Sequence, residues 1–369
     1  MFAAFGVASP FIPAFLAGRG LGPGAIGVVL GLGSAVRLVA GPAGGRLADR
    51  TGRPRLVLGG LLLASAIVAL GYAPARGVAS LALVSLLHAA VLAPLTPVAD
   101  ALALAAAARD RFDYGWLRGS GSAAFIVASA ASGMLVGIYG LPTVIWLNAG
   151  LLFLACPCAA AVPAMLDRSA KRGTVPKGAA AWRELLAVPG FMPLMGVVAL
   201  VGGSHAMHDS FAVIRWEEAG MSAGAAGALW GTSVAAEVLV FFVLGRPLIA
   251  RLGVGGAASL SALAGIVRWS VTSVTAAVPA MAAVEPLHGF TFALLHLVAM
   301  RVIAANVPAR LAATAQACYG TIALGAATTG LTFLSGPLYG ALGARAFLPM
   351  AVLCALALPF AARLRASPT

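Results

Sequence analysis

The stretch GGRLADRTGRPR, residues 44–55, places five charged side chains within twelve positions: Arg46, Asp49, Arg50, Arg53 and Arg55. The apolar runs on either side of it, residues 27–43 and 56–73, contain one charged residue, Arg37. A short charged connection between two long apolar runs is typical of a chain that crosses a membrane, turns and crosses again. The stretch therefore predicts a membrane-spanning hairpin.

The composition extends this prediction to the whole chain. Of its 369 residues, 61% are hydrophobic and 9% are charged, against about 25% charged in soluble domains. Apolar runs of about 20 residues, enough to cross the hydrocarbon core of a bilayer, recur from end to end. The net charge of +13 lies in the short connections, where it orients the chain in the lipid bilayer; this excludes a nucleic-acid partner as its explanation. We predict an all-α polytopic membrane protein.

Charge clusters and Gly/Pro positions divide the chain into twelve predicted transmembrane helices: 2–17, 25–45, 56–75, 78–105, 115–139, 141–164, 189–213, 223–244, 255–275, 278–304, 311–337 and 343–364. The longest polar connection, 165–188, separates an N-terminal six-helix half, 1–164, from a C-terminal six-helix half, 189–369. GRLADRTGRP (45–54) has a weaker counterpart, without the acid, in GRPLIARLGVGG (245–256). Internal repeats of this kind are common in secondary transporters, and they predict two pseudo-symmetric halves.

The distribution of Lys and Arg predicts the orientation. Seventeen of the 24 Lys and Arg residues lie on one side of the predicted spans, which the positive-inside rule makes the cytoplasmic side. The connections on the other side carry four: Arg19, Arg76, Arg215 and Arg345. Both termini are therefore expected in the cytoplasm, with the chain in a bacterial-type inner (plasma) membrane.

The charged stretch resembles the cytoplasmic loop signature of the major facilitator superfamily, G-x-L-a-D-r-x-G-r. In that family the acid and the basic residues latch the two halves together, and the glycines let helices approach closely. The resemblance implies a conformational latch made of Gly45, Asp49, Arg50, Gly52 and Arg53. The alternative is that these charges only fix the orientation in the membrane.

Four further stretches resemble the 3-phenylpropionate permease branch of the superfamily, to which lactose permeases and nucleoside–proton symporters are more distantly related. They are DYGWLRGSGSAAFI (113–126), SHAMHDSF (204–211), LWGTSVAAEVLVFF (229–242) and LHGFTFALLHLVAMRVI (287–303). The resemblance implies the twelve-helix major facilitator fold and a small-molecule substrate, no cofactor, and a monomer. The substrate itself is weakly indicated, because substrates change freely on one fold.

Ionisable residues inside predicted spans are functional candidates, because each costs about 2.5–3.5 kcal/mol to insert. Asp100 and Arg118 have the order and spacing of an acid–arginine pair that contacts the sugar in lactose permease. The resemblance implies that they pair, leaving Arg118 able to bind a substrate carboxylate. The alternative is a structural ion pair.

Glu237 lies in the middle of the eighth predicted span. Burial favours its neutral form, as a proton carrier requires. Arg268, in the ninth span, is its expected counter-charge, and both have counterparts in lactose permease. A purely structural pair is the alternative.

Span ten contains Glu285, His288, Phe292 and His296, whose offsets of 3, 7 and 11 place them on one face of a regular helix. His288 matches a histidine of the lactose permease proton relay, but the acid expected three residues later is Thr291. Glu285 could replace that acid, although it lies close to the expected outer end of the span. His288 could also be a hydrogen-bonded packing residue.

Span seven contains His205 and Asp209, four residues apart, with His208 beside them. Neither this group nor the cysteine spacing predicts a metal site. We expect His205, His208 and Asp209 to form a gate or to line a cavity.

These features predict a secondary active transporter that takes up a small organic solute with protons by alternating access. The arginines and the aromatic residues Trp230, Trp269, Phe290 and Phe292 suit an aromatic carboxylate bound by Arg118 or Arg268. Proton-antiport efflux of a drug or metabolite is the alternative. An enzyme is not expected, since the sequence contains no HExxH, GxSxG or P-loop motif.

Overall fold

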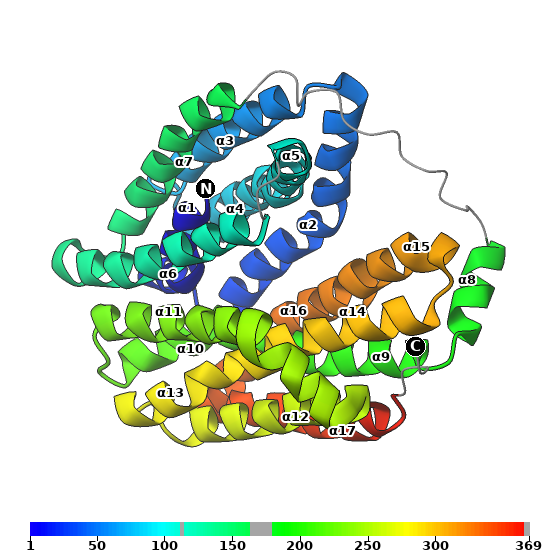
Figure 1. The fold of residues 1–369 in the computed structure, drawn as a ribbon. Coiled ribbons are helices and arrows are strands. Elements are labelled where there is room, and N and C mark those ends of the chain that lie inside the picture. The colour runs from blue at the N-terminus through cyan, green and yellow to red at the C-terminus, as the bar shows by residue number, and fades with distance from the viewer. Residues whose placement is uncertain (111–113, 163–178, 365–369) are drawn as a thin grey trace. The chain divides into compact units, whose positions relative to one another are not determined.

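The computed structural model describes residues 1–110, 114–162 and 179–364. Within these ranges the chain forms helices joined by short turns, and no strand is present (Figure 1). Two compact units are separable: the first comprises Met1–Lys171 and Val213–Gly231, and the second Arg172–Ala212 and Thr232–Thr369. The boundaries expected from the sequence for the two halves stay a prediction. Of the expected linker, 165–178 lies outside the described residues.

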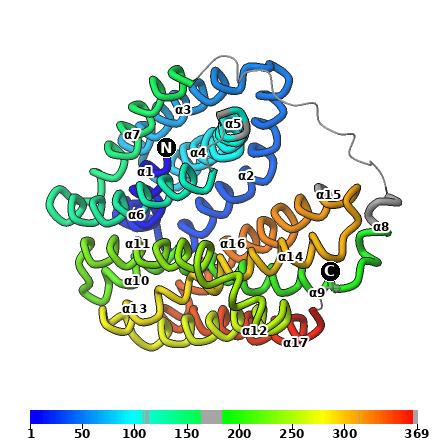
Figure 2. The backbone as a smooth tube through the Cα atoms, viewed as in Figure 1, coloured from blue at the N-terminus to red at the C-terminus, as the bar shows by residue number. Residues whose placement is uncertain are grey.

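In the described residues of the N-terminal part, the chain forms seven helices. They are α1 (Phe2–Gly18), α2 (Pro23–Thr51), α3 (Pro54–Leu70), α4 (Gly77–Leu92), α5 (Leu95–Asp110), α6 (Tyr114–Tyr139) and α7 (Thr143–Ala161). α3 packs along α7 and α1 along α6, although each pair is far apart in sequence. Figure 2 shows these two pairs of neighbouring helices within the first unit.

The C-terminal part contains more numerous and less regular elements. Its α-helices are α8 (Ala179–Ala187), α9 (Phe191–Val197), α10 (His205–Glu218), α11 (Ala223–Leu239), α12 (Gly245–Val274), α13 (Val278–Val284), α14 (Leu295–Asn306), α15 (Ala312–Ala317), α16 (Ala327–Leu342) and α17 (Leu348–Ala362). Four π-helical segments interrupt them: η2 (Val198–Gly202), η3 (Val240–Leu244), η5 (Gly289–Leu294) and η7 (Cys318–Ala326). The 3₁₀ segments are η4 (Glu285–Leu287), η6 (Ala309–Leu311) and η8 (Gly343–Phe347).

The helices account for the twelve predicted spans. Eight described helical stretches are long and apolar enough to cross a membrane, and α1 and α3 are shorter apolar helices. Two of the eight, of 52 and 54 residues, are each long enough for two spans. The breaks within them fall at Gly253 and Gly343, whose φ angles of 68° and 54° favour glycine.

The charged stretch at residues 44–55 is mostly helical. α2 continues six residues past the predicted end of its span, and the Gly52 N–H closes it by donating to the Ala48 carbonyl at 3.1 Å. Gly52 has a φ of 60°, the left-handed conformation of a helix C-terminal cap. Pro54 then begins α3, where its missing N–H costs no hydrogen bond. The motif is therefore a rigid corner between two helices.

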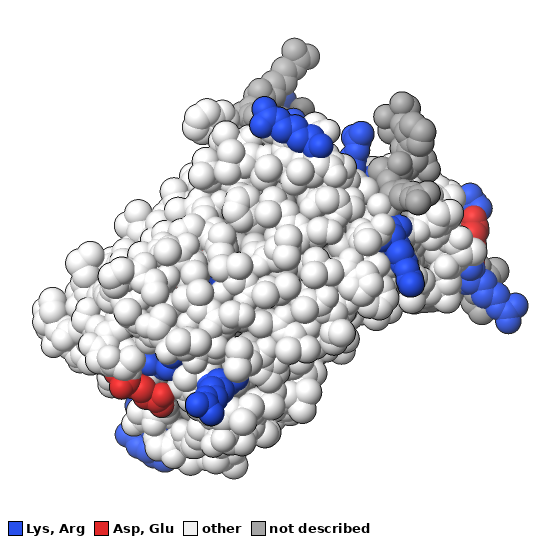
Figure 3. Space-filling view, turned by 90° about the horizontal axis from the view of Figure 1, so that it is seen from below, with Lys and Arg blue, Asp and Glu red and all other residues white. Residues whose placement is uncertain are grey.

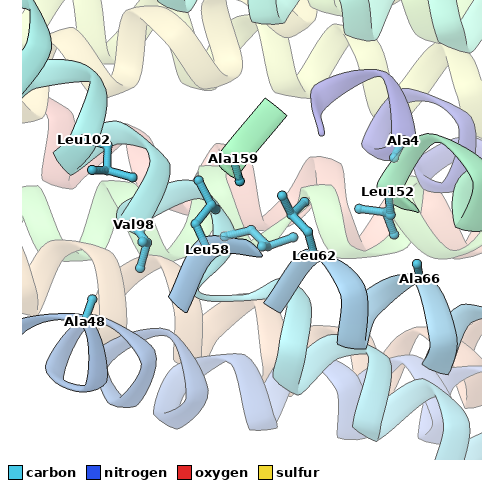
Figure 4. Packing of buried hydrophobic residues seen from close by; sticks show 10 residues of the cluster. Ala4, Ala48, Leu58, Leu62, Ala66, Val98, Leu102, Leu152 and Ala159 are labelled. Carbon is cyan, nitrogen blue, oxygen red and sulfur yellow. The ribbon is translucent and has the colours of Figure 1, made fainter. Parts of the chain in front are cut away.

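The first unit has a core of small and branched apolar side chains from α1, α2, α3, α5 and α7 (Figure 4). Its buried members are Ala4, Ala48, Leu58, Leu62, Ala66, Leu95, Val98, Leu102, Leu152 and Ala159. Lipid tails are as apolar as leucine, so close packing stabilises such a core more than removal from water does. Alanines at the contact points permit this packing.

The outer surface is correspondingly apolar. On the face shown in Figure 3 most of the surface is uncharged, with isolated Lys, Arg, Asp and Glu side chains. Large apolar side chains such as Val39, Ile138 and Phe153 are more than half exposed. Such exposure is expected where lipid is the solvent.

Candidate functional site

The second unit buries an ion pair between two spans. Arg268, in α12, donates from Nη2 to Glu285 Oε2, in η4, at 2.6 Å, and both side chains have no exposed surface. The expectation that Arg268 pairs with Glu237 is therefore wrong. Because an unpaired charge at this depth would cost several kcal/mol, the two residues depend on each other.

Three donors converge on the same oxygen of Glu285. Besides Arg268, the Ser233 hydroxyl donates to Oε2 at 2.5 Å, and His208 Nε2 lies 3.2 Å from it. The second oxygen, Oε1, and the Nε of Arg268 are buried and form no hydrogen bond within the described part of the chain. Oε2 of Glu285 is thus surrounded by hydrogen-bond donors, whereas Oε1 has no donor in the described residues.

A second acid approaches the arginine through a histidine. Arg268 Nη1 donates to His288 Nδ1 at 3.1 Å, and His288 Nε2 lies 3.5 Å from Glu237 Oε2. Arginine can only donate, so His288 Nδ1 must carry the lone pair, and its proton, when neutral, is on Nε2 facing Glu237. Glu237 and Arg268 are therefore linked through His288.

Close approach of two spans positions this link. A Cβ on Gly289 would lie 2.6 Å from the Ala236 carbonyl oxygen of α11, so only glycine permits the observed contact. Glu237 follows Ala236 in the chain and His288 precedes Gly289. The glycine thus brings the two ionisable residues together.

An irregular backbone places Glu285 and His288 around one guanidinium. Pro286 has no N–H to continue the helix, and the chain passes through the 3₁₀ segment η4 into the π segment η5. The regular helical face predicted for span ten is therefore not formed. Its fourth member, His296, accepts or donates a hydrogen bond with the Tyr319 hydroxyl at 2.8 Å and packs on Phe241.

Aromatic rings enclose the cluster. The Arg268 guanidinium lies 4.6 Å from the centroid of the Trp269 ring, whose Nε1–H donates to Ser204 Oγ at 2.9 Å. Trp269 is fully buried and so acts as packing rather than as an open binding surface. The His288 and Phe292 rings stack at 5.5 Å, and Phe292 is 37% exposed, which leaves an aromatic face accessible beside the charges.

His205, His208 and Asp209 begin α10 and have different surroundings. His208 is buried, and its Nδ1 lies 3.2 Å from Oδ1 of Asp209, whose side chain is 55% exposed. His205 is buried against the rings of His288 and Trp269. Within the described ranges, no group of three or more His, Cys, Asp or Glu side chains could hold a metal ion.

Asp100 and Arg118 lie in the first unit, in α5 and α6, and are half-buried. Arg118 places its guanidinium 4.5 Å from the Phe2 ring centroid, and Tyr114 is the hydrogen-bonding neighbour of Asp100. In the parts of the chain that the structure describes, Asp100 and Arg118 form no ion pair with each other. The expected pairing is wrong in this conformation, because Arg118 is directed to the aromatic ring of α1.

The latch residues lie at the α2–α3 corner, where Asp49, Arg50 and Arg53 are exposed. Gly45 was expected to permit close helix approach, but a Cβ there would meet nothing within 4 Å. The close approach is at Gly44, whose Cβ would lie 2.2 Å from Pro94 Cβ. Gly52 serves the backbone turn described above.

Sequence reasoning missed Ser233, Gly289 and the buried position of His208 against Glu285. Pro286 and Gly289, close together beside two ionisable residues, were the available indication of an irregular helix there. The pairing of side chains from α10, α11, α12 and η4 depends on tertiary packing.

The fold and the buried charge cluster define a multi-pass, all-α membrane transporter. The family model described as "MFS_1 like family" matches residues 1–349. The chain is 33% identical over 362 residues, 95% of its length and 92% of the relative, to the "Probable 3-phenylpropionic acid transporter" of Escherichia coli (strain K12). The chain belongs to the MFS_1 like family, of the major facilitator superfamily.

Other relatives agree with this assignment. The "Uncharacterized transporter YwbF" of Bacillus subtilis (strain 168) is 23% identical over 315 residues, covering 85% of this chain and 77% of that protein. The crystal structure of nucleoside transporter NupG has a TM-score of 0.83 at 14% identity, covering 98% of this chain and 94% of that one. A bacterial homolog to human lysosomal transporter Spinster has a TM-score of 0.71 at 15% identity, covering 98% and 93%. The matched proteins are transporters and not enzymes.

Proposed function

We propose that this transporter carries out proton-coupled uptake of a small organic anion by alternating access. The buried Arg268–Glu285 pair carries the proposal. A guanidinium without exposed surface needs a carboxylate partner. Protonation of Glu285 removes that partner, and the carboxylate of a substrate replaces it. A proton and an organic anion are therefore bound together, and neither is bound favourably alone.

An aromatic carboxylate, such as 3-phenylpropionate, fits the surroundings of the arginine. Phe292 and His288 offer stacked rings beside Arg268, with part of the Phe292 ring exposed. The relative named as a probable 3-phenylpropionic acid transporter supports the same substrate class. We assign substrate binding to Arg268, His288 and Phe292, with Asp100 and Arg118 as candidates in the first unit.

Glu237 is a second proton-coupling residue, in addition to Glu285. It is about one-fifth exposed and approaches His288, so its charge influences the histidine that accepts from Arg268. A proton on Glu237 would weaken this contact. Glu285 contacts Arg268 directly, and Glu237 approaches it through His288.

The Lys/Arg distribution supports a bacterial-type inner membrane location with both termini in the cytoplasm. The α2–α3 corner with Asp49 then lies on the cytoplasmic side, where a latch would act. A monomer is proposed, with protons as the coupling ion and no metal or other cofactor.

The proposal predicts proton movement that depends on substrate. Addition of 3-phenylpropionate to proteoliposomes containing the protein should make the external medium alkaline, because protons enter with the anion. Glu237→Gln should abolish this signal. A panel of other aromatic acids and nucleosides, each tested in the same way, defines the substrate class.

Uptake that is unaffected by collapsing the pH gradient would contradict proton coupling. External acidification, or extrusion of lipophilic cations, would instead support the efflux alternative. Empty liposomes with the same compounds correct for passive entry of the protonated acids.

A further inference from the structure

We propose that His208 transfers protons between the exposed carboxylate of Asp209 and the buried carboxylate of Glu285. This inference rests on the proton coupling proposed above and supplies its route. Glu285 has no exposed surface, so protons need a path through the protein to reach it. His208 is the residue that contacts both acids.

The geometry connects an exposed group to a buried one through a single imidazole. His208 Nδ1 lies 3.2 Å from Asp209 Oδ1, and His208 Nε2 lies 3.2 Å from Glu285 Oε2. Asp209 is 55% exposed, His208 is 4% exposed and Glu285 is fully buried. Each ring nitrogen therefore faces one carboxylate, and burial increases along the path.

The transfer balances in two proton movements. Neutral His208 begins with its proton on Nε2, donating to Glu285. It accepts a proton at Nδ1 from protonated Asp209 and gives the Nε2 proton to Glu285. Asp209 is left as a carboxylate, His208 is left neutral with its proton on Nδ1, and Glu285 is left neutral. The same steps in reverse release the proton.

A second contact provides a partner for His208 after the transfer. Arg268 Nη2 lies 3.2 Å from His208 Nε2, and arginine can only donate. Nε2 has a lone pair only when the proton is on Nδ1, so Arg268 can then donate to it. Nδ1–H donates to Asp209 in that state. During the transfer, each tautomer of His208 therefore has hydrogen-bond partners on both ring nitrogens.

Other charged or titratable groups face the same imidazole. They are His205 in α10, Arg268 in α12 and His288 between η4 and η5. Arg268 disfavours a doubly protonated His208, whereas Asp209 and Glu285 favour it.

The test separates proton movement from substrate exchange. His208→Gln and Asp209→Asn are compared with His296→Gln, a histidine within a span that contacts Tyr319 instead. Proteoliposomes are assayed for exchange of 3-phenylpropionate at equal pH and for its accumulation driven by a pH gradient. We expect both variants to retain exchange and to lose gradient-driven accumulation at least tenfold, with His296→Gln unchanged.

Asp209→Asn keeps the test valid if His208→Gln does not fold, because an exposed side chain can be changed with little effect on stability. Gradient-driven accumulation at the wild-type level in Asp209→Asn would overturn the route. Equal loss of exchange and accumulation in a folded Asp209→Asn would also overturn it, since that pattern indicates a role in substrate binding. If the wild-type protein itself exchanges substrate without responding to the gradient, proton coupling fails, and the route fails with it.

Discussion

At the scale of single residues, the informative feature is a buried ion pair in which two polar atoms form no hydrogen bond in the described residues. Arg268 and Glu285 are fully buried and 2.6 Å apart, while Glu285 Oε1 and Arg268 Nε are without a hydrogen bond in the described residues. Replacement of such pairs by apolar residues is often neutral or stabilising. Stability alone therefore does not explain this pair, whereas the proposed exchange of its carboxylate for that of a substrate would.

Removal of both members of the pair should cost less than the sum of the two single removals. Glu285→Gln leaves Arg268 without its buried counter-charge, which destabilises the folded state by about 3–5 kcal/mol. Arg268→Gln leaves Glu285 buried and uncompensated, with a similar loss of stability. The double variant should be more stable than the sum of the single effects predicts, by at least about 1 kcal/mol. Thermal unfolding in detergent measures all four proteins. Additive losses would show that the two charges do not interact.

At the scale of the helices, departures from regular α-geometry gather in the second unit. The π segments η3 and η5 and the 3₁₀ segment η4 adjoin Glu237, Glu285 and His288. π segments are rare and frequently occur at functional sites. Here η4 and η5 flank Glu285 and His288, which both contact the guanidinium of Arg268.

The contact at Gly289 should be necessary for the site. Gly289→Ala adds a Cβ 2.6 Å from the Ala236 carbonyl oxygen, and the backbone of α11 must move away. We expect transport to fall at least tenfold, because Glu237 and His288 separate. Gly330→Ala is the matched control, since its Cβ would meet nothing within 4 Å.

Transport and unfolding are measured for both glycine variants. Wild-type transport by Gly289→Ala would show that the close approach of these spans is not required. Equal losses in the two variants would point to a general effect of replacing glycine in a helix.

At the scale of the whole molecule, the exposed charges at the α2–α3 corner are candidates for conformational control. Their helix ends rigidly at Gly52 and the next begins at Pro54. Asp49 and Arg50 therefore project from an ordered helix end, and their positions are defined. A latch residue must be exposed in this way to exchange partners.

Asp49→Asn tests the latch. The change removes a charge without altering side-chain size, and a latch contributing about 1–3 kcal/mol would change transport about 5–150-fold. Binding of 3-phenylpropionate in detergent should change much less than transport. Arg55→Gln is a comparison within the same corner, because Arg55 donates to the Val162 carbonyl at 3.3 Å and is not part of the latch. Unchanged transport by Asp49→Asn would leave the corner with an orienting role.

The sequence by itself determined the class of fold and the number of spans, because hydrophobic length and charged connections follow directly from the thickness and polarity of a bilayer. It also identified Glu237, Arg268, Glu285 and His288 as unusual, since each is ionisable within an apolar run. Only the tertiary structure decided how they pair. Arg268 bonds Glu285 and reaches Glu237 through His288, because the 3₁₀ and π segments and the contact at Gly289 set positions that helical periodicity does not encode.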